Sequence, residues 1–300
     1  MLKVLVTGGA GFIGSHIVNH HVSLGDKVWV IDNLTTGRAS NLPDDIEMLY
    51  TNWERIPDVD FVYHLGMPSS SPIYKENPKL VARTVMDAIR LLEYAKMNKV
   101  PVVFASTSSL YNGNLTPWDE YQQIQVTDYY AEARFAVERL FELYNKLHGV
   151  KSIGLRLFSV YGPGEKPKGQ YANLVTQFLL DMKQGKRPLI FFDGNQTRDF
   201  IHVNDVQDAF YKSMILLMSD KVSFLKINVG TGIANSLNCL VELINKELGT
   251  NIKPTYFTPK ITNYIWETLA DTVVMNEMLK IKPISLEMGL HNLALYYGGE

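Results

Sequence analysis

The chain has 300 residues, of which 46% are apolar and 20% are charged, the balance of a globular protein with a sizeable core. The formal net charge of −2 gives no basic field to attract nucleic acid or an anionic membrane, and no run approaches the roughly 20 apolar residues of a membrane span. The single Cys239 excludes an internal disulfide framework, and glycines stand where a signal peptide needs apolar residues, so we expect a cytoplasmic protein.

The first half of the chain alternates short β-rich runs with helical patterns. Strands are expected at 3–6, 27–32, 61–65, 101–106 and 152–158, and helices at 12–24, 78–97 and 129–148. Strands that alternate with helices form βαβ units, so this half predicts a doubly wound parallel sheet with helices on both faces.

The pattern changes after residue 160. Helices dominate there, with short strands between them, and are expected at 170–184, 205–218, 236–247, 272–279 and 286–296. We therefore expect two domains, residues 1–160 and 161–300, with some later segments returning to the first.

The stretch "VLVTGGAGFIGSH" (4–16) carries the strongest local signal. A strand runs directly into Gly8, Gly11 and Gly14, where a helix begins. Glycines permit the tight turn and the close approach of backbone N–H groups to a pyrophosphate, and the helix N-terminus adds partial positive charge. This context predicts a dinucleotide site. Asp32, at the end of the second strand, is placed to accept the ribose hydroxyls, which favours NAD over NADP, while the nearby Arg38 leaves NADP as an alternative.

Seven motifs in one order resemble the extended short-chain dehydrogenase/reductase family, in particular its nucleotide-sugar epimerases of the UDP-glucose/UDP-galactose type. They are "TGGAGFIGSH", "IDNLTTG", "FASTSSLY", "YYAEAR", "LRLFSVYGPG", "QTRDFIHVNDV" and "INVGTG". The resemblance implies a Rossmann-type domain followed by a smaller α/β substrate-binding domain. It also implies NAD as the cofactor, a nucleotide sugar as the substrate, and epimerisation at C4 through a keto-sugar.

The resemblance assigns a catalytic set of Thr107, Tyr130 and Arg134. Moving a hydride off a carbinol carbon requires removal of the hydroxyl proton, and a phenol with a reference pKa of about 10 is a poor base at neutral pH. A cation one helical turn away favours the phenolate. By itself "YYAEAR" is equally compatible with a plain helix start.

The resemblance also assigns binding residues. Those expected at the cofactor are Gly8, Gly11, Phe12, Ile13, Gly14, Asp32, Asn33, Thr35, Thr36, Gly37, Asn52, Trp53, Leu65, Gly66, Tyr130 and Arg134. Those expected at the substrate are Ser70, Thr107, Ser159, Asn173, Leu174 and Arg198. The alternatives to a ligand-binding role are simple packing for Trp53 and an ion pair with Asp199 for Arg198. No metal site is expected, because His16 and His20 have no evident third ligand.

The chain departs from the family pattern in several places. Arg134 stands where the family has lysine, and Ser159 where it more often has asparagine. The family's arginine-rich loop corresponds to residues 258–271, in which Lys260 is the only cation. Dehydratases and decarboxylases of the family have an acidic residue just after the Ser or Thr of the catalytic set, but serines follow Thr107 here, which argues against both reactions.

Three points stay open at this level. The helical stripe Ala136, Leu140, Leu143 and Leu147 is expected to be buried, either in a homodimer helix bundle of the family type or within one subunit. A non-catalytic NAD sensor and a net dehydrogenase or reductase are the alternatives to an epimerase.

Overall fold

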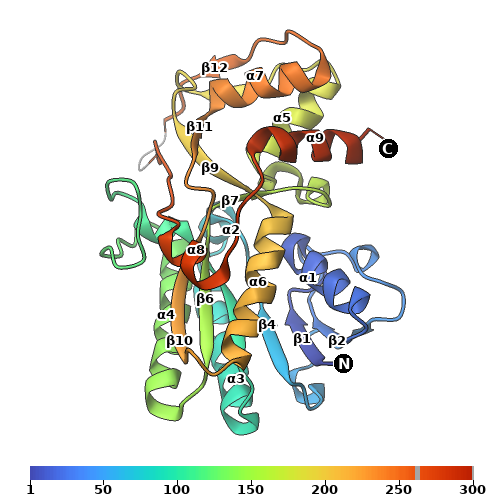
Figure 1. Cartoon of the computed structure of the whole chain (residues 1–300). Helices are drawn as coiled ribbons and strands as arrows, with labels where there is room; N and C mark the ends of the chain where they lie inside the picture. The colour runs from blue at the N-terminus through green and yellow to red at the C-terminus, as the bar shows by residue number, and fades with distance from the viewer. Residues whose placement is uncertain (261–263, 299–300) are drawn as a thin grey trace.

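The largest element of the computed structural model, which describes residues 1–260 and 264–298, is a seven-stranded parallel sheet with the order β10-β6-β5-β4-β1-β2-β3 (Figure 1). Its strands are β1 (Lys3–Thr7), β2 (Lys27–Ile31), β3 (Glu47–Met48), β4 (Phe61–His64), β5 (Val102–Thr107), β6 (Ser152–Leu157) and β10 (Phe224–Val229). The central strands are apolar runs because helices cover both of their faces. The predicted doubly wound parallel sheet is confirmed.

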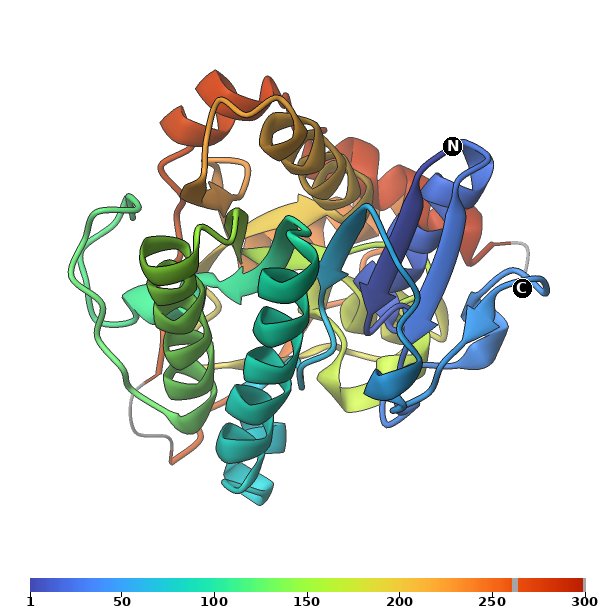
Figure 2. The ribbon, with the colours of Figure 1, turned by 90° about the horizontal axis from the view of Figure 1, so that it is seen from below.

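Two layers of helices enclose this sheet. Helices α3 (Leu80–Asn98) and α4 (Tyr129–His148) lie side by side on one face, while α1 (Phe12–Ser23) and α6 (Val203–Met218) pack together on the other (Figure 2). The short α2 (Ser71–Glu76) packs against α4, and α8 (Val273–Leu279) packs against α6 and β10. No helix among the described residues is long and apolar enough to cross a membrane.

Helix α4 positions the tyrosine and the arginine expected at the site. It begins after Asp128, whose Oδ1 accepts a hydrogen bond from the backbone N–H of Ala131 at 2.8 Å, and it ends at Gly149, which has a φ of 70°. A carboxylate N-cap and a left-handed glycine are strong local start and stop signals. The predicted helix at 129–148 is therefore confirmed.

Two residues of the predicted stripe along α4, Leu143 and Leu147, are not buried within one subunit, and their burial in a homodimer stays a prediction. Leu143 and Leu147 are 46% and 64% exposed, while the face against the sheet carries Val137, Phe141 and Arg134. The helix lies on the sheet with this second stripe, in which Arg134 is 4% exposed and donates hydrogen bonds to Ala105 in β5 and to Pro68 in the loop after β4. Apolar periodicity alone did not identify the face that carries a buried cation.

A second, smaller unit lies beyond the carboxyl ends of the strands (Figure 1). It contains the sheet β11-β9-β7, the pair β12-β8, and three helices with their own apolar core. Its elements are β7 (Ser159–Tyr161), α5 (Leu174–Lys183), β8 (Leu189–Phe191), β9 (Thr197–His202), β11 (Ala234–Ser236), α7 (Leu237–Leu248), β12 (Thr255–Phe257) and α9 (Leu286–Tyr296). Short 3-10 turns complete the fold at η1 (Ala39–Asn41), η2 (Trp53–Arg55), η3 (Ser108–Tyr111) and η4 (Lys166–Tyr171).

The later segments that return to the first unit are α6, β10 and α8, whose apolar residues belong to the core of the large sheet. We therefore propose that the chain returns to the first unit twice after residue 160, once in α6 and β10 and once in α8. The second unit then comprises roughly the segments around α5, α7 and α9.

Candidate active site

One large cavity, of about 900 Å³, opens between the two units. That volume lies at the upper end of the range for small-molecule sites. Parallel strands of a doubly wound sheet present their carboxyl ends to such a cavity, which is where ligands bind in this architecture. The ends of β1, β2, β4, β5 and β6 all contribute lining residues.

The glycine turn after β1 is shaped as a cradle. Gly8 has a φ of +71°, and a Cβ at Gly14 would lie 2.1 Å from the carbonyl oxygen of Gly8, so neither position accepts a side chain without a shift. Helix α1 follows with Gly11 as its N-cap and without a side-chain cap, which leaves its first N–H groups to a ligand. Gly8, Gly11, Phe12, Ile13 and Gly14 all line the cavity, and this arrangement fits a pyrophosphate.

Asp32 lies beside the cradle and is 9% exposed. Its two carboxylate oxygens accept one backbone N–H each, from Ala10 at 3.0 Å and from Leu34 at 2.8 Å. Because a carboxylate oxygen can accept a second hydrogen bond, Asp32 fixes the glycine turn and still offers acceptors to ribose hydroxyls. Asn33, Thr35 and Thr36 also line the cavity. Gly37 does not, since it packs on Ala10, where a Cβ would lie 2.8 Å from the carbonyl carbon.

At the far end of the dinucleotide half, Trp53 lines the cavity but Asn52 does not. The side-chain oxygen of Asn52 accepts the backbone N–H of Glu54 at 3.2 Å and caps the turn η2. The expected contact between Asn52 and a ligand is therefore replaced by a local cap, and Thr51 takes a place in the lining. Sequence reasoning also missed the residues that α3 contributes, namely Leu80, Arg83, Thr84, Met86, Asp87 and Arg90.

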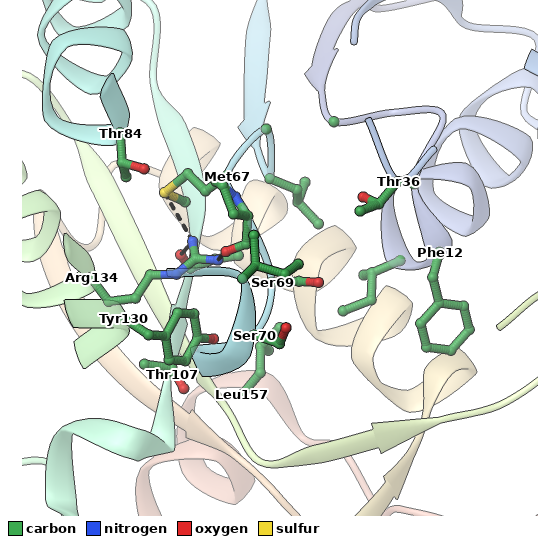
Figure 3. Close-up of a pocket in the computed structure, with 18 of the residues that line it drawn as sticks. Phe12, Thr36, Met67, Ser69, Ser70, Thr84, Thr107, Tyr130, Arg134 and Leu157 are labelled. Carbon is green, nitrogen blue, oxygen red and sulfur yellow. Dashed lines mark hydrogen bonds between the residues drawn. The ribbon is translucent and has the colours of Figure 1, made fainter. Parts of the chain in front are cut away.

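Thr107 and Tyr130 face the cavity together with Ser70 (Figure 3). Thr107 ends β5 and is 5% exposed, and its Oγ1 accepts the backbone N–H of Ser109 at 3.1 Å, which fixes the side chain. Tyr130 lies in the first turn of α4. The Oγ of Ser70 is buried and has no hydrogen-bond partner among the described residues, as expected of a group that awaits a ligand. Leu65 and Gly66 line the same region.

Hydrogen bonds within the protein fix the guanidinium of Arg134. Its Nη1 donates to Met67 Sδ at 2.9 Å and to the carbonyl oxygen of Ala105 at 3.2 Å, and its Nη2 donates to the carbonyl oxygen of Pro68 at 2.9 Å. The guanidinium carbon lies 5.2 Å from the centre of the Tyr130 ring. Arg134 therefore ties the loop after β4 to α4 and fixes a positive charge at the phenol ring, as Figure 3 shows for Met67.

The charge of Arg134 also acts on His64, at the end of β4. Burial, reinforced by the neighbouring guanidinium, lowers the pKa of His64 to about 3. His64 is therefore neutral at physiological pH, and its Nδ1 is hydrogen-bonded to Thr7 Oγ1 at 2.7 Å. The Arg134 side chain is thus the cation of this part of the cavity.

A buried polar network joins β5, which ends at Thr107, to helix α4, which carries Tyr130. Glu138, one turn after Arg134, accepts a hydrogen bond from Ser106 at 2.6 Å and two from Arg156, at 2.9 and 2.7 Å. Arg156 also donates to Tyr111 Oη at 2.6 Å. Glu138 and Arg156 are 2% and 1% exposed. The network joins α4 to β5 and β6, and so it fixes Thr107 relative to Tyr130.

In the substrate half, the cavity is lined by Ser159, Asn173 and Arg198, but not by Leu174, which packs against the second core. Asn173 caps α5, because its Oδ1 accepts the N–H of Val175 at 3.0 Å, and its Nδ2 donates to the carbonyl oxygen of Val160 at 3.1 Å. The apolar side chain of Leu174 is partly buried against this core, and its expected contact with the ligand stays a prediction.

Arg198 makes no ion pair with Asp199. Asp199 instead accepts hydrogen bonds from Thr231 and from the backbone N–H groups of Gly232 and Ala270. Arg198 donates to the carbonyl oxygen of Thr197 at 2.7 Å, and its guanidinium lies 5.6 Å from the Tyr264 ring centre. Burial lowers the pKa of Arg198, and no carboxylate of residues 1–260 or 264–298 forms an ion pair with it. A desolvated cation of this kind is suited to an anionic ligand.

The loop 258–271 is described only in part, because residues 261–263 of it lie outside the described residues. Lys260 is exposed and does not line the cavity. Ile265 and Thr268 from this loop do line it. The expectation that this loop brings no second arginine to the ligand therefore holds for its described part, which offers an apolar and a hydroxyl side chain.

A doubly wound sheet with a glycine cradle, a carboxylate at the end of the second strand and a facing tyrosine is typical of a dinucleotide-binding enzyme. The model of the NAD dependent epimerase/dehydratase family matches residues 4–230, and the chain belongs to this family. NAD is therefore its cofactor, and the alternative of NADP raised by Arg38 is set aside. Arg38 is exposed and does not line the cavity.

Comparison with known proteins gives relatives of more than one activity. The chain is 35% identical over 269 residues to a "Putative UDP-glucose 4-epimerase" of Methanocaldococcus jannaschii, with 86% of each chain covered. It is 30% identical over 268 residues to UDP-glucuronic acid decarboxylase 1 of Xenopus tropicalis, covering 83% of this chain and 61% of the relative. The crystal structure of UDP-glucose 4-epimerase from Thermotoga maritima with UDP-glucose superposes with a TM-score of 0.92 at 29% identity, over 99% of both chains.

Proposed function

We propose that the protein epimerises a nucleotide-diphosphate sugar, with a UDP-hexose of the glucose/galactose type as substrate and C4 as the reacting carbon. The observation that carries this proposal is that Thr107 and Tyr130 line the same cavity as the glycine cradle, while Ser108 and Ser109 follow Thr107. Elimination or decarboxylation needs a further acid or base at this place, and epimerisation does not. The activity of the Methanocaldococcus and Thermotoga relatives agrees with it.

In this proposal each side chain has a defined task. Tyr130 takes the proton of the sugar hydroxyl as the C–H bond breaks and returns it to the product, while Thr107 orients that hydroxyl. NAD, when bound, supplies the hydride acceptor. Ser70 and Ser159 hold the sugar, and Arg198 with Asn173 holds the nucleotide diphosphate. The keto-sugar then rotates inside the cavity and presents the opposite face of its carbonyl carbon to the returning hydride. Return of the hydride to that face inverts the configuration of the carbon.

The cofactor residues are proposed on the same footing. Gly8, Gly11 and the first turn of α1 hold the pyrophosphate, and Asp32 holds the ribose. Thr35, Thr36, Trp53, Leu65 and Gly66 complete the enclosure, with Thr51 in the place expected for Asn52. Arg134 acts on the ring of Tyr130 and on the loop after β4.

The decisive experiment is incubation of the purified protein with UDP-glucose, UDP-galactose and their N-acetyl counterparts, with product analysis by chromatography. Interconversion without net NADH formation supports the epimerase. Stoichiometric NADH formation identifies a dehydrogenase, UDP-xylose from UDP-glucuronic acid identifies a decarboxylase, and bound NAD without conversion of any sugar identifies a sensor.

Arg134→Met is expected to lower kcat by about tenfold or more, because methionine removes the positive charge beside the Tyr130 ring and the hydrogen bonds to Ala105 and Pro68. Arg134→Lys keeps a point charge but not the forked contacts to Met67, Pro68 and Ala105. It is expected to lower kcat less than Arg134→Met does. The measurement is kcat and kcat/KM of the three proteins, and equal values would exclude a role for Arg134 in the reaction.

We also propose that two copies associate through α3 and α4, and that the enzyme works in the cytoplasm, where Cys239 stays reduced. The exposed apolar side chains on these two helices include Met86, Leu143 and Leu147. Exposed apolar side chains gathered on one face are typical of an interface between subunits. Light scattering of Leu143→Glu/Leu147→Glu is expected to show a monomer where the unchanged protein is a dimer, and an unchanged mass for the variant would contradict this.

A further inference from the structure

The diphosphate of a nucleotide sugar carries two negative charges, but the site residues proposed above include only one cation directed at it, Arg198. The described cavity lining contains four other cations. Arg83 and Arg90 are exposed on α3 and pair with Asp87, and Arg134 is engaged by the loop after β4 and by β5. The fourth is Lys168, which lies in the turn η4 and which no sequence motif singled out.

Lys168 is held by a buried carboxylate. Its Nζ lies 2.9 Å from Glu165 Oε1, and Glu165 is completely buried. The same oxygen accepts the N–H of Asn173 at 2.9 Å, and Oε2 accepts the hydroxyl of Thr176 at 2.7 Å. Glu165 is therefore fixed by the start of α5, and it holds Lys168 in a defined position next to Asn173.

The position of Lys168 joins both halves of the cavity. Its Nζ lies 5.4 Å from the centre of the Phe12 ring, and Phe12 opens helix α1 at the cradle. An ammonium group has three donors, and one of them is directed to Glu165. Glu165 and Lys168 both line the cavity. The Glu165 carboxylate is fully buried while the Lys168 side chain is 19% exposed, so the ammonium is the more accessible group of the pair.

We propose that Lys168 is a diphosphate-binding residue, and that it serves as the second cation in place of the arginine absent from the described part of the loop 258–271. This inference rests on the proposed function, in that the diphosphate is taken to be that of the nucleotide sugar. Lys168 and Arg198 then bind it from two sides, with Asn173 between η4 and α5. Glu165 is a positioning residue that keeps the ammonium in place.

The test compares Lys168→Ala with Lys96→Ala, whose lysine forms an ion pair of the same i,i+3 spacing with Glu93 on α3, away from the cavity lining. Isothermal titration calorimetry with UDP, uridine and inorganic pyrophosphate is done on the protein saturated with NAD. Because Lys168→Ala removes a charge-assisted hydrogen bond, we expect it to weaken the binding of UDP and of pyrophosphate by about 10- to 100-fold. Uridine affinity is expected to stay unchanged, and Lys96→Ala is expected to match the unchanged protein.

Steady-state kinetics provides a second readout. Lys168→Ala is expected to raise KM for the nucleotide sugar by a similar factor with kcat within about threefold, and Lys168→Arg is expected to recover most of the affinity. Glu165→Gln is expected to raise KM by less than Lys168→Ala does, because it removes the charge that orients the ammonium but keeps a hydrogen-bonding side chain.

The outcomes separate this inference from the proposed function. Loss of diphosphate affinity in Lys168→Ala without turnover of any sugar would uphold the inference and reject the epimerase. Equal UDP and pyrophosphate affinities for the unchanged protein and Lys168→Ala would overturn it even if the enzyme epimerises sugars. Weaker NAD binding with unchanged UDP binding would assign Lys168 to the cofactor pyrophosphate and overturn it as well.

Discussion

Tyr130→Phe is expected to lower kcat by about 10²- to 10⁴-fold, the usual contribution of a positioned proton-transfer group. The phenol hydroxyl is the group that the mechanism asks to take and return the substrate proton, and it faces the cavity beside Thr107 (Figure 3). The change removes one oxygen and keeps the ring, so the ring retains its contacts with the Arg134 guanidinium and with the tilted Tyr74 ring. The measurement is the initial rate of sugar interconversion at saturating substrate.

The chain offers a matched control for this change in the neighbouring residue. Tyr129 precedes Tyr130 in the same helical turn, is 51% exposed and does not line the cavity. Tyr129→Phe is therefore expected to keep full activity. Retention of NAD and of UDP affinity by Tyr130→Phe shows that only the chemical step has changed. Turnover within threefold of the unchanged enzyme would remove Tyr130 from the mechanism.

Glu138→Leu is expected to lower the free energy of unfolding by about 3–5 kcal/mol, the cost of leaving a buried charge without its partner. Although burial alone would lower the pKa of the Arg156 guanidinium, the Glu138 carboxylate raises it above its usual value, so Arg156 stays charged. Without Glu138, Arg156 keeps Tyr111 Oη and the carbonyl oxygen of Glu120 as acceptors. Urea denaturation followed by tryptophan fluorescence measures the effect.

Two further variants test whether the stability lost in Glu138→Leu comes from the unpaired buried charge of Arg156. Glu138→Leu combined with Arg156→Met removes both charges and is expected to recover much of the lost stability, because well-packed apolar residues often replace a buried ion pair at little cost. Glu142→Leu on the same helix removes solvent-accessible ion pairs with Lys146 and Lys226 and is expected to cost no more than about 1 kcal/mol. Equal losses for Glu138→Leu and Glu142→Leu would contradict the account of a buried network.

The sequence alone determined the features that depend on a few consecutive residues. A strand, a glycine turn and a helix follow one another in residues 3–23, and the steric requirement for glycine is met within that stretch. Asp128 and Gly149 set the ends of α4 through contacts within a few residues. Buried parallel strands can be recognised in the sequence as apolar runs, so the order of strands and helices along the chain could be predicted as well.

Only the tertiary structure decided which distant side chains meet. The acceptors of Arg134 lie 29 to 67 residues away, in β5 and in the loop after β4, which are neighbours because β4 and β5 pair in the sheet. Asp199 turns from its neighbour Arg198 to Thr231, Gly232 and Ala270 because β9 and the later loops converge there. Asn52 and Leu174 are expected at a ligand from the motifs, and the structure adds that Asn52 caps a turn and that Leu174 packs partly against the second core. Periodicity and motif spacing describe a residue's neighbours along the chain, whereas burial and charge pairing depend on its neighbours in space. The position of Lys168 over the Phe12 ring depends on neighbours in space, and so only the tertiary structure revealed it.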